Sequence, residues 1–176
     1  MQSAELQRAE SLIVSVPDYP EPGVIFRDIA PLLADAEAFQ SVVAELLRPF
    51  TGQFDVIAAI EARGFLLAGA AAAAAGVGLV PIRKAGKLPR PAASLDYTLE
   101  YGTATLEMHD DLKAGTRVLL MDDVLATGGT LAAGCELVHE VGCEVIGVSM
   151  LLELDALAGR KVLGDRVPVH TVFHVD

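Results

Sequence analysis

The sequence has little cysteine, few positive charges and no hydrophobic segment that suits a membrane. Cys135 and Cys143 are the only cysteines among 176 residues, which excludes a disulfide framework. Thirteen Lys and Arg against 24 Asp and Glu give a net charge of −11. This balance disfavours nucleic acid or an anionic membrane as a partner, because either would require a basic face. Residues 64–82 carry no charge, but they are mostly Ala and Gly and contain Pro81, so a helix followed by a strand explains them better than a membrane span.

The size and composition fit one compact domain covering residues 1–176. Hydrophobic residues make up 52% of the chain and the mean hydropathy is +0.45, as expected for an α/β domain whose strands are covered on both faces. Residues 1–10 are polar and of mixed charge, so they do not resemble a signal peptide. We therefore expect a cytoplasmic protein.

Short apolar segments that predict strands alternate with segments that predict helices. The predicted strands are residues 55–60, 79–83, 118–121, 144–152 and 169–173, with a hairpin around Gly102, and the predicted helices are residues 4–16, 35–47, 65–75, 131–141 and 155–163. This alternation predicts an α/β fold with a doubly wound, mostly parallel sheet and helices on both faces. Ligands of such sheets bind at the carboxyl ends of strands, which brings the ends of 55–60, 79–83 and 118–121 to one crevice.

The most informative segment is residues 118–130, where an apolar strand leads into acidic and then small residues. Asp122 and Asp123 follow the strand, and the loop before the next helix is Ala126, Thr127, Gly128, Gly129 and Thr130. Backbone N–H groups at the start of that helix, together with the threonine hydroxyls, can bind a phosphate monoester. The two carboxylates would repel phosphate but can accept hydrogen bonds from a vicinal diol. The segment therefore predicts a ribose-5-phosphate site.

Other nucleotide and metal motifs do not match. The sequence contains no G-x-x-x-x-G-K-[ST] and no G-x-G-x-x-G that opens a helix after a strand. His170 and His174 are four residues apart in a predicted strand, where this spacing does not form a helical metal-ligand pair, so no protein-held metal is predicted. Five of the 13 cations fall within 28 residues, which suits a small polyanion, although a solvated basic face is the alternative; they are Arg63, Arg83, Lys84, Lys87 and Arg90.

Five segments in order resemble one enzyme family. Residues 118–130 resemble the phosphoribosyl-pyrophosphate (PRPP) signature of type I phosphoribosyltransferases, and residues from about 17 to 157 resemble the adenine phosphoribosyltransferases. The other matching segments are residues 18–28, 61–65, 82–89 and 97–102. The resemblance implies the type I phosphoribosyltransferase fold, with an N-terminal helix and base-binding hood (about 1–34) and a flexible loop and hairpin lid (about 84–109). It also implies transfer of the phosphoribosyl group from PRPP to adenine in purine salvage, dependence on Mg2+, and a homodimer.

The resemblance assigns roles at both ends of PRPP. Asp122 and Asp123 would hold the ribose hydroxyls, and residues 126–130 would surround the 5-phosphate. Arg63, which is also a candidate catalytic residue, would meet the pyrophosphate together with Arg83, Lys84 and Lys87. Positive groups there would stabilise charge that grows on the leaving pyrophosphate. Magnesium would be held mainly by PRPP oxygens and water.

The resemblance also assigns the base site and the proton chemistry. Ile25, Phe26 and Arg27 would bind adenine, with the Phe26 ring stacked on the purine. Glu100 would relay a proton or offset ribosyl charge from the hairpin lid, and Tyr101 would lie beside it. Relatives that act on hypoxanthine or guanine usually have Asp in place of Ala126 and Lys in place of Gly129, which favours adenine here.

Three alternatives stay open from the sequence. A phosphoribosyltransferase for another base, such as xanthine, would use PRPP but not adenine. A PRPP-sensing regulator would bind the ligand without chemistry, but it should carry a basic DNA-binding extension. A structural subunit with a decayed site is disfavoured by the full set of candidate residues.

Overall fold

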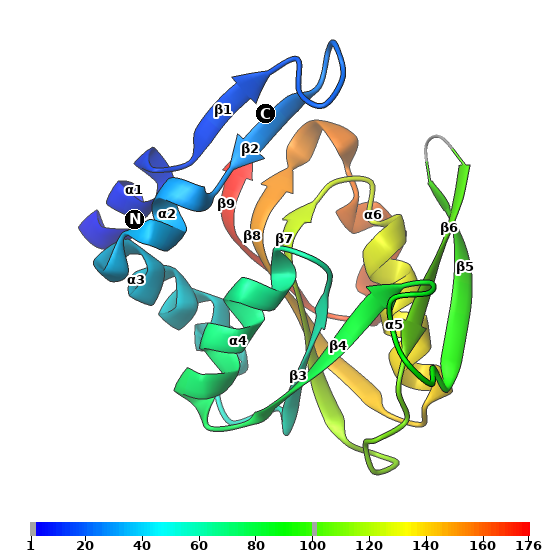
Figure 1. Cartoon of the computed structure of the whole chain (residues 1–176). Coiled ribbons are helices and arrows are strands. Elements are labelled where there is room, and N and C mark those ends of the chain that lie inside the picture. The colour runs from blue at the N-terminus through cyan, green and yellow to red at the C-terminus, as the bar shows by residue number, and fades with distance from the viewer. Residues whose placement is uncertain (1–2, 100–101) are drawn as a thin grey trace. The chain divides into compact units, whose positions relative to one another are not determined.

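The computed structural model describes residues 3–99 and 102–176 (Figure 1). The chain divides into two compact units, Met1–Glu45 and Leu46–Asp176. Within the described residues, every helix is too short or too polar to cross a membrane. The uncharged residues 64–82 form a helix and a strand, as predicted, because Gly76 in the left-handed conformation (φ 68°) ends the helix.

The first unit holds a small antiparallel strand pair and short helices. Its elements are α1 (Ala4–Ser11), β1 (Val14–Pro17), β2 (Ile25–Asp28), α2 (Ala30–Ala34) and most of α3 (Ala36–Leu47). The Asp35 carboxylate accepts a hydrogen bond of 3.0 Å from the Ala38 N–H, which confirms the predicted cap of α3. The prediction of one helix through Val16 was wrong, because the β-branched residues after Ser11 favour the extended chain of β1.

The second unit is a seven-stranded sheet in the order β5-β6-β4-β3-β7-β8-β9. Strands β3, β4, β7, β8 and β9 are parallel, whereas β5 and β6 form an antiparallel hairpin at one edge, so the mostly parallel sheet and the hairpin are confirmed. The elements are η1 (Arg48–Phe50), β3 (Val56–Ile60), α4 (Gly64–Ala75), β4 (Gly78–Lys84), β5 (Ala93–Leu99), β6 (Gly102–Met108), β7 (Arg117–Leu125), α5 (Gly129–Glu140), β8 (Glu144–Leu154), η2 (Asp155–Leu157), α6 (Arg160–Leu163), η3 (Gly164–Arg166) and β9 (Val169–Val175).

The central strands are buried on both faces. Val56, Ala58 and Ile60 of β3 pack in a core cluster with side chains of α5. Ile57 and Ala59 are fully buried as well, and they point to the opposite face because successive side chains of a strand alternate. Helices α4 and α5 lie on either side of the sheet (Figure 1), which explains why these strands are apolar throughout.

The end of β7 and the segment after β8 differ clearly from the sequence predictions. Strand β7 does not end at Met121 but continues to Leu125, because β8 pairs with it as far as the Leu125–Glu153 position. The predicted helix over residues 155–163 is divided into η2 and α6, since Ala158 adopts a left-handed conformation (φ 49°) between them.

Candidate functional site

The predicted phosphate loop, residues 126–130 and called the phosphate loop below, runs from the end of β7 into the first turn of α5, at the carboxyl edge of the parallel strands. Gly128 has a φ of 84°, which turns the chain into the first residue of α5, Gly129. A pocket of about 80 Å³ lies here, lined by Asp122, Val124, Leu125, Ala126, Thr127, Gly128, Thr130 and Leu131. Unpaired N–H groups at the start of a twelve-residue helix favour an anion in this pocket. A hollow of about 730 Å³ beside α6 is larger, but its lining mixes cations with Glu153, Asp155 and Asp165, so the smaller pocket fits phosphate better.

The two aspartates of β7 lie next to this loop. Asp123 is buried and Asp122 is half-buried, and the Asp122 carboxylate accepts a hydrogen bond of 2.8 Å from the Asp123 N–H. Burial raises the pKa of Asp122, and the negative charge of Asp123 raises it further. A Cβ atom on Gly64 would lie 2.7 Å from an Asp122 carboxylate oxygen, so the start of α4 lies against this aspartate. Glycine is required here for close approach.

Arg63, immediately before α4, forms an ion pair with Asp123. Their closest nitrogen and oxygen are 2.5 Å apart, and the side chains are 32% and 11% exposed. A predicted pyrophosphate ligand and a predicted ribose ligand are therefore brought together. The positive charge of Arg63 compensates the negative charge of the buried Asp123 carboxylate.

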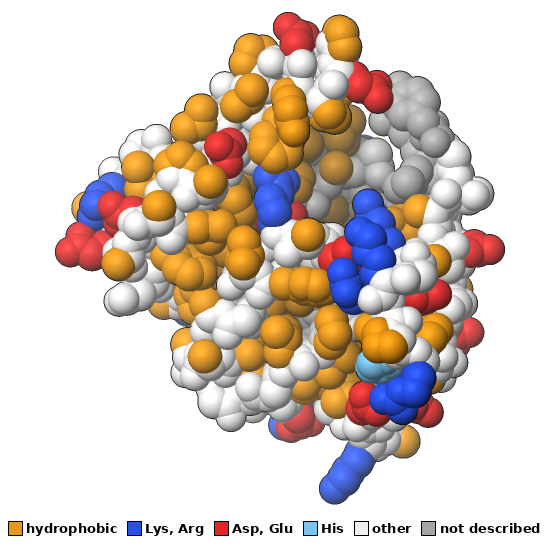
Figure 2. Space-filling view, viewed as in Figure 1, with side chains coloured by type: hydrophobic (Ala, Val, Ile, Leu, Met, Phe, Trp, Pro, Cys, Tyr) orange, Lys and Arg blue, Asp and Glu red, His pale blue; other side chains and the backbone are white. Residues whose placement is uncertain are grey.

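Three further cationic residues share one acceptor, Glu61, to which no role was assigned from the sequence. The Glu61 side chain is 5% exposed and lies 3.4 Å from the Arg83 guanidinium and 3.2 Å from the Lys87 ammonium. It also accepts a hydrogen bond of 2.5 Å from the Lys84 N–H. Burial opposes ionisation, but these bonds outweigh it and lower the pKa of Glu61. Figure 2 shows Lys and Arg side chains gathered near the end of β4.

Glu61 could have been suspected from its place in the sequence. It follows the buried strand β3 directly, two residues before Arg63, and acidic residues at such strand ends commonly serve a site. The ends of residues 55–60 and 79–83 were expected at one crevice, but only the folded sheet shows that Glu61 pairs there with Arg83 and Lys87.

The hairpin contributes one contact to the phosphate loop that the sequence did not reveal. The hydroxyls of Tyr97, on β5, and Thr130 lie 3.5 Å apart, too far for a strong hydrogen bond but close enough to place β5 beside the loop. The predicted catalytic residues Glu100 and Tyr101 lie outside the described residues.

The three predicted adenine-binding residues lie together on β2 in the first unit. Ile25 is 52% exposed. The Phe26 ring contacts the Tyr19 ring edge-on, with centroids 5.2 Å apart. An Arg27 guanidinium nitrogen donates a hydrogen bond of 2.5 Å to the Ser15 hydroxyl of β1. The Tyr19–Phe26 aromatic pair is a surface on which a planar base can stack.

The chain resembles known proteins along almost its whole length. Residues 32–171 match the family model described as phosphoribosyl transferase domain. The adenine phosphoribosyltransferase of Renibacterium salmoninarum is 56% identical over 158 residues, which cover 89% of this chain and 87% of that protein. The crystal structure of adenine phosphoribosyltransferase from Rhodothermus marinus has a TM-score of 0.94 and 46% identity, and the match covers 99% of this chain and 100% of that one. The Saccharomyces cerevisiae enzyme, solved with adenine and an imino-altritol bisphosphate, has a TM-score of 0.89 and 35% identity over 96% of this chain and 98% of that one.

A mostly parallel sheet with a small pocket and an acidic pair at one edge, together with the family match, defines the class of this protein as a phosphoribosyltransferase. At more than 50% identity over most of its length, the chain belongs to the adenine phosphoribosyltransferase family.

Proposed function

We propose that the protein transfers the 5-phosphoribosyl group of PRPP to adenine, giving AMP and pyrophosphate in purine salvage. One observation carries the proposal: Asp122 lines the phosphate pocket, and its neighbour Asp123 contacts Arg63. Phosphate donors, diol acceptors and a cation thus meet at one edge of the sheet, in the order in which PRPP presents its 5-phosphate, ribose hydroxyls and pyrophosphate.

Different residues at this edge of the sheet bind different groups of PRPP. The five residues of the phosphate loop bind the 5-phosphate through N–H groups and the hydroxyls of Thr127 and Thr130. Asp122 and Asp123 accept hydrogen bonds from the ribose diol. Arg63, Arg83, Lys84 and Lys87 stabilise the charge that develops on pyrophosphate as it leaves. When PRPP binds, Arg63 leaves Asp123 and contacts the pyrophosphate group. The Arg83 and Lys87 side chains leave Glu61 in the same way.

The reaction breaks the bond between ribose C1 and a pyrophosphate oxygen and forms a bond from C1 to N9 of adenine. The ribose becomes oxocarbenium-like in the transition state, the electron pair of the broken bond leaves on pyrophosphate, and the N9 proton is released. Glu100 handles that proton or offsets the ribosyl charge, with Tyr101 beside it, and the hairpin around them limits hydrolysis of PRPP by water.

The base site uses the hood on the first unit. Phe26 stacks on adenine, and the backbone around Ile25 and Arg27 reads its polar edge. Ala126 offers no carboxylate to handle a proton of a 6-oxopurine ring, which favours adenine. The yeast relative was solved with adenine, which supports the same base for this chain.

Mg2+ fits this site as a substrate-borne ion. The nearby protein donors, Asp122 and Asp123, are carboxylate oxygens, the donor type that Mg2+ prefers, while PRPP oxygens and water would supply most ligands. When bound, the ion neutralises charge on the pyrophosphate group. Removal of Mg2+ should abolish turnover.

The wider properties proposed for the protein follow from its substrate and family. PRPP is too highly charged to cross a membrane, so a cytoplasmic enzyme meets it where it is made. We also propose one catalytic domain per chain and a homodimer, on the basis of family membership.

The test is AMP formation from PRPP and Mg2+ with adenine, hypoxanthine, guanine or xanthine. Turnover with adenine alone is expected. Glu100→Ala should lose roughly 100-fold or more, the lower scale for general acid–base work. Ser94→Ala, which alters an exposed side chain of the same hairpin, serves as the control. Turnover with an oxopurine alone would overturn the Ala126 argument, and PRPP binding without turnover on any base would favour a sensor.

A further inference from the structure

The phosphate loop is in direct backbone contact with a segment from the far end of the chain. A Cβ atom on Gly159 would lie 2.1 Å from the Ala126 carbonyl oxygen and 2.9 Å from the Gly128 nitrogen. A Cβ atom on Gly128 would in turn lie 2.3 Å from the Gly159 carbonyl oxygen. The two backbones therefore touch with no space for a side chain between them. The Gly128 nitrogen is one of the N–H groups proposed to face the 5-phosphate.

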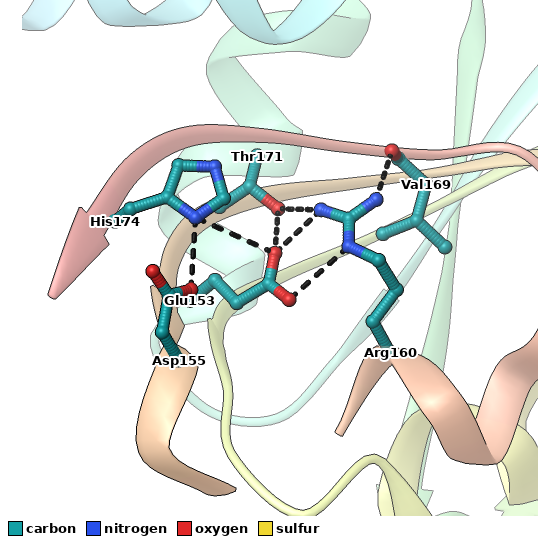
Figure 3. A network of polar contacts seen from close by, with 6 residues as sticks. All are labelled: Glu153, Asp155, Arg160, Val169, Thr171 and His174. Carbon is teal, nitrogen blue, oxygen red and sulfur yellow. Dashed lines mark hydrogen bonds and ion pairs between the residues drawn. The ribbon is translucent and has the colours of Figure 1, made fainter. Parts of the chain in front are cut away.

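The residue after Gly159 is held firmly to two strands of the sheet. The Arg160 guanidinium forms two hydrogen bonds to the Glu153 carboxylate, at 3.1 and 2.5 Å, and one of 2.7 Å to the Val169 carbonyl (Figure 3). It also donates to the Thr171 hydroxyl at 3.0 Å, and that hydroxyl donates to Glu153 at 2.9 Å. Glu153 and Thr171 are buried in β8 and β9. A bidentate arrangement on a buried carboxylate fixes both the distance and the orientation of the guanidinium.

This cluster resembles a metal site only in part. Oxygen or nitrogen atoms of Glu153, Asp155 and His174 lie within 4.8 Å of one another. However, both Glu153 oxygens already accept hydrogen bonds from the Arg160 guanidinium, whose positive charge would repel a metal ion. The geometry is that of an arginine held by a buried carboxylate. The neighbouring residue, Gly159, is the one that contacts the phosphate loop.

We propose that Gly159 and Arg160 are positioning residues for PRPP: Arg160 fixes the Gly159 backbone to β8 and β9, and this backbone sets the shape of the phosphate loop. This inference rests on the proposed function. It predicts that disturbance of the contact weakens binding of the 5-phosphate while the adenine site keeps its affinity. Gly159 has φ −59° and ψ −27°, which alanine adopts readily, so the effect of a substitution comes from the lost space and not from backbone strain.

The first test compares Gly159→Ala with Gly69→Ala. Gly69 lies in α4, and a Cβ atom added there meets nothing within 4 Å, so this control makes the same chemical change without a clash. For Gly159→Ala we expect the KM for PRPP to rise about 10- to 100-fold, the scale of an ångström-size misplacement, with the KM for adenine changed little. Binding of ribose 5-phosphate, measured by calorimetry, should weaken in parallel. Gly69→Ala should match the parent in both assays.

The second test uses Arg160 in case Gly159→Ala does not fold. Arg160→Lys keeps the charge but loses the bidentate geometry, so it should raise the KM for PRPP less than Arg160→Gln does. A folded Gly159→Ala variant that binds ribose 5-phosphate as the parent does would overturn the proposal. So would Arg160 variants that lose thermal stability with an unchanged KM for PRPP. If the parent binds ribose 5-phosphate but turns over no adenine, the proposed function fails while the calorimetric comparison still decides the role of Gly159.

Discussion

The phosphate loop and the pyrophosphate cations would bind two ends of one substrate, yet they are built differently. The loop uses backbone groups packed against other backbone, so that Gly128 and Gly159 leave no space between them. The cations Arg63, Arg83 and Lys87 are side chains, about 32%, 34% and 54% exposed, and each is paired with a carboxylate. The loop is therefore preorganised before substrate arrives, whereas the cations must change partners. Substitutions should act on PRPP affinity at the loop and on leaving-group chemistry at the cations.

The largest expected effect is at Arg63. Arg63→Ala removes a cation from the pyrophosphate side and leaves Asp123 without its ion-pair partner. We expect kcat to fall about 100- to 1,000-fold, the scale found when one transition-state donor is removed. Product inhibition by pyrophosphate should weaken as well.

Arg117→Ala is the matched control for Arg63. Arg117 also pairs with an aspartate, Asp55, but at the amino end of β7, and both side chains are 46% exposed. This variant should retain the kcat of the parent. A drop in kcat at Arg63 with pyrophosphate inhibition unchanged would contradict the assignment to the leaving group.

The next largest effect is expected at Gly128, where a control variant separates the effect of the lost space from the effect of backbone strain. Gly128→Ala adds a Cβ atom 2.3 Å from the Gly159 carbonyl oxygen at a φ of 84°. Gly52→Ala adds one at a φ of 76° in open space, so both variants carry similar strain and only the first has a clash. We expect a rise of about 100-fold in the KM for PRPP at Gly128 alone. Equal effects at both positions would show that strain, not packing, governs the loop.

A smaller effect is expected at Glu61. Glu61→Gln removes the charge that the Arg83 and Lys87 side chains share. Because these cations must leave Glu61 to contact pyrophosphate, the variant should bind PRPP more tightly. A hydrogen bond to a charged group contributes roughly 1.5–3 kcal/mol, but these cations are partly exposed and solvent screens them, so we expect only about a fivefold fall in the KM for PRPP. Steady-state kinetics at fixed adenine measure it. A rise in the KM would mean that Glu61 orders the cations for pyrophosphate instead of competing for them.

The smallest effect is on stability in acid. Burial opposes ionisation of Glu153, but hydrogen bonds from Arg160 and Thr171 outweigh it and lower the pKa of this carboxyl below its usual 4.5. The resulting stabilisation is fully present above the unfolded pKa, near 4.5, and is lost as the pH falls through the lower folded value. Melting temperatures between about pH 3 and 7 should fall less steeply for Glu153→Gln than for the parent. Parallel curves would show that Glu153 adds no acid-dependent stability.

Most of the fold could be predicted because its signals are local. The apolar segment at residues 118–121 and the glycines after it gave the strand, the loop and the start of α5. The end of β7 was wrong by four residues, because pairing with β8 carries the strand through two aspartates that favour turns. The division of residues 155–166 was missed for a similar reason, since one left-handed residue, Ala158, interrupts a helical pattern.

The sequence predicted which residues belong to the candidate site, but it did not predict which of them contact one another. The sequence named Arg63 and Asp123 for different groups of the substrate, and only the fold shows them as an ion pair. Glu61 and Tyr97 were given no role, because their partners come from other strands and from the start of α5.

The sequence by itself determined the α/β class, the strand, loop and helix around residues 118–130, and the family, because these depend on patterns among neighbouring residues. Only the tertiary structure decided which carboxylate holds each cation, and that a glycine 31 positions after Gly128 lies against the loop. The reason is physical. Strand pairing and close backbone packing join residues far apart in the chain. The need for glycine at such a contact can be recognised only when the structure shows the backbone atom with which a Cβ atom would clash.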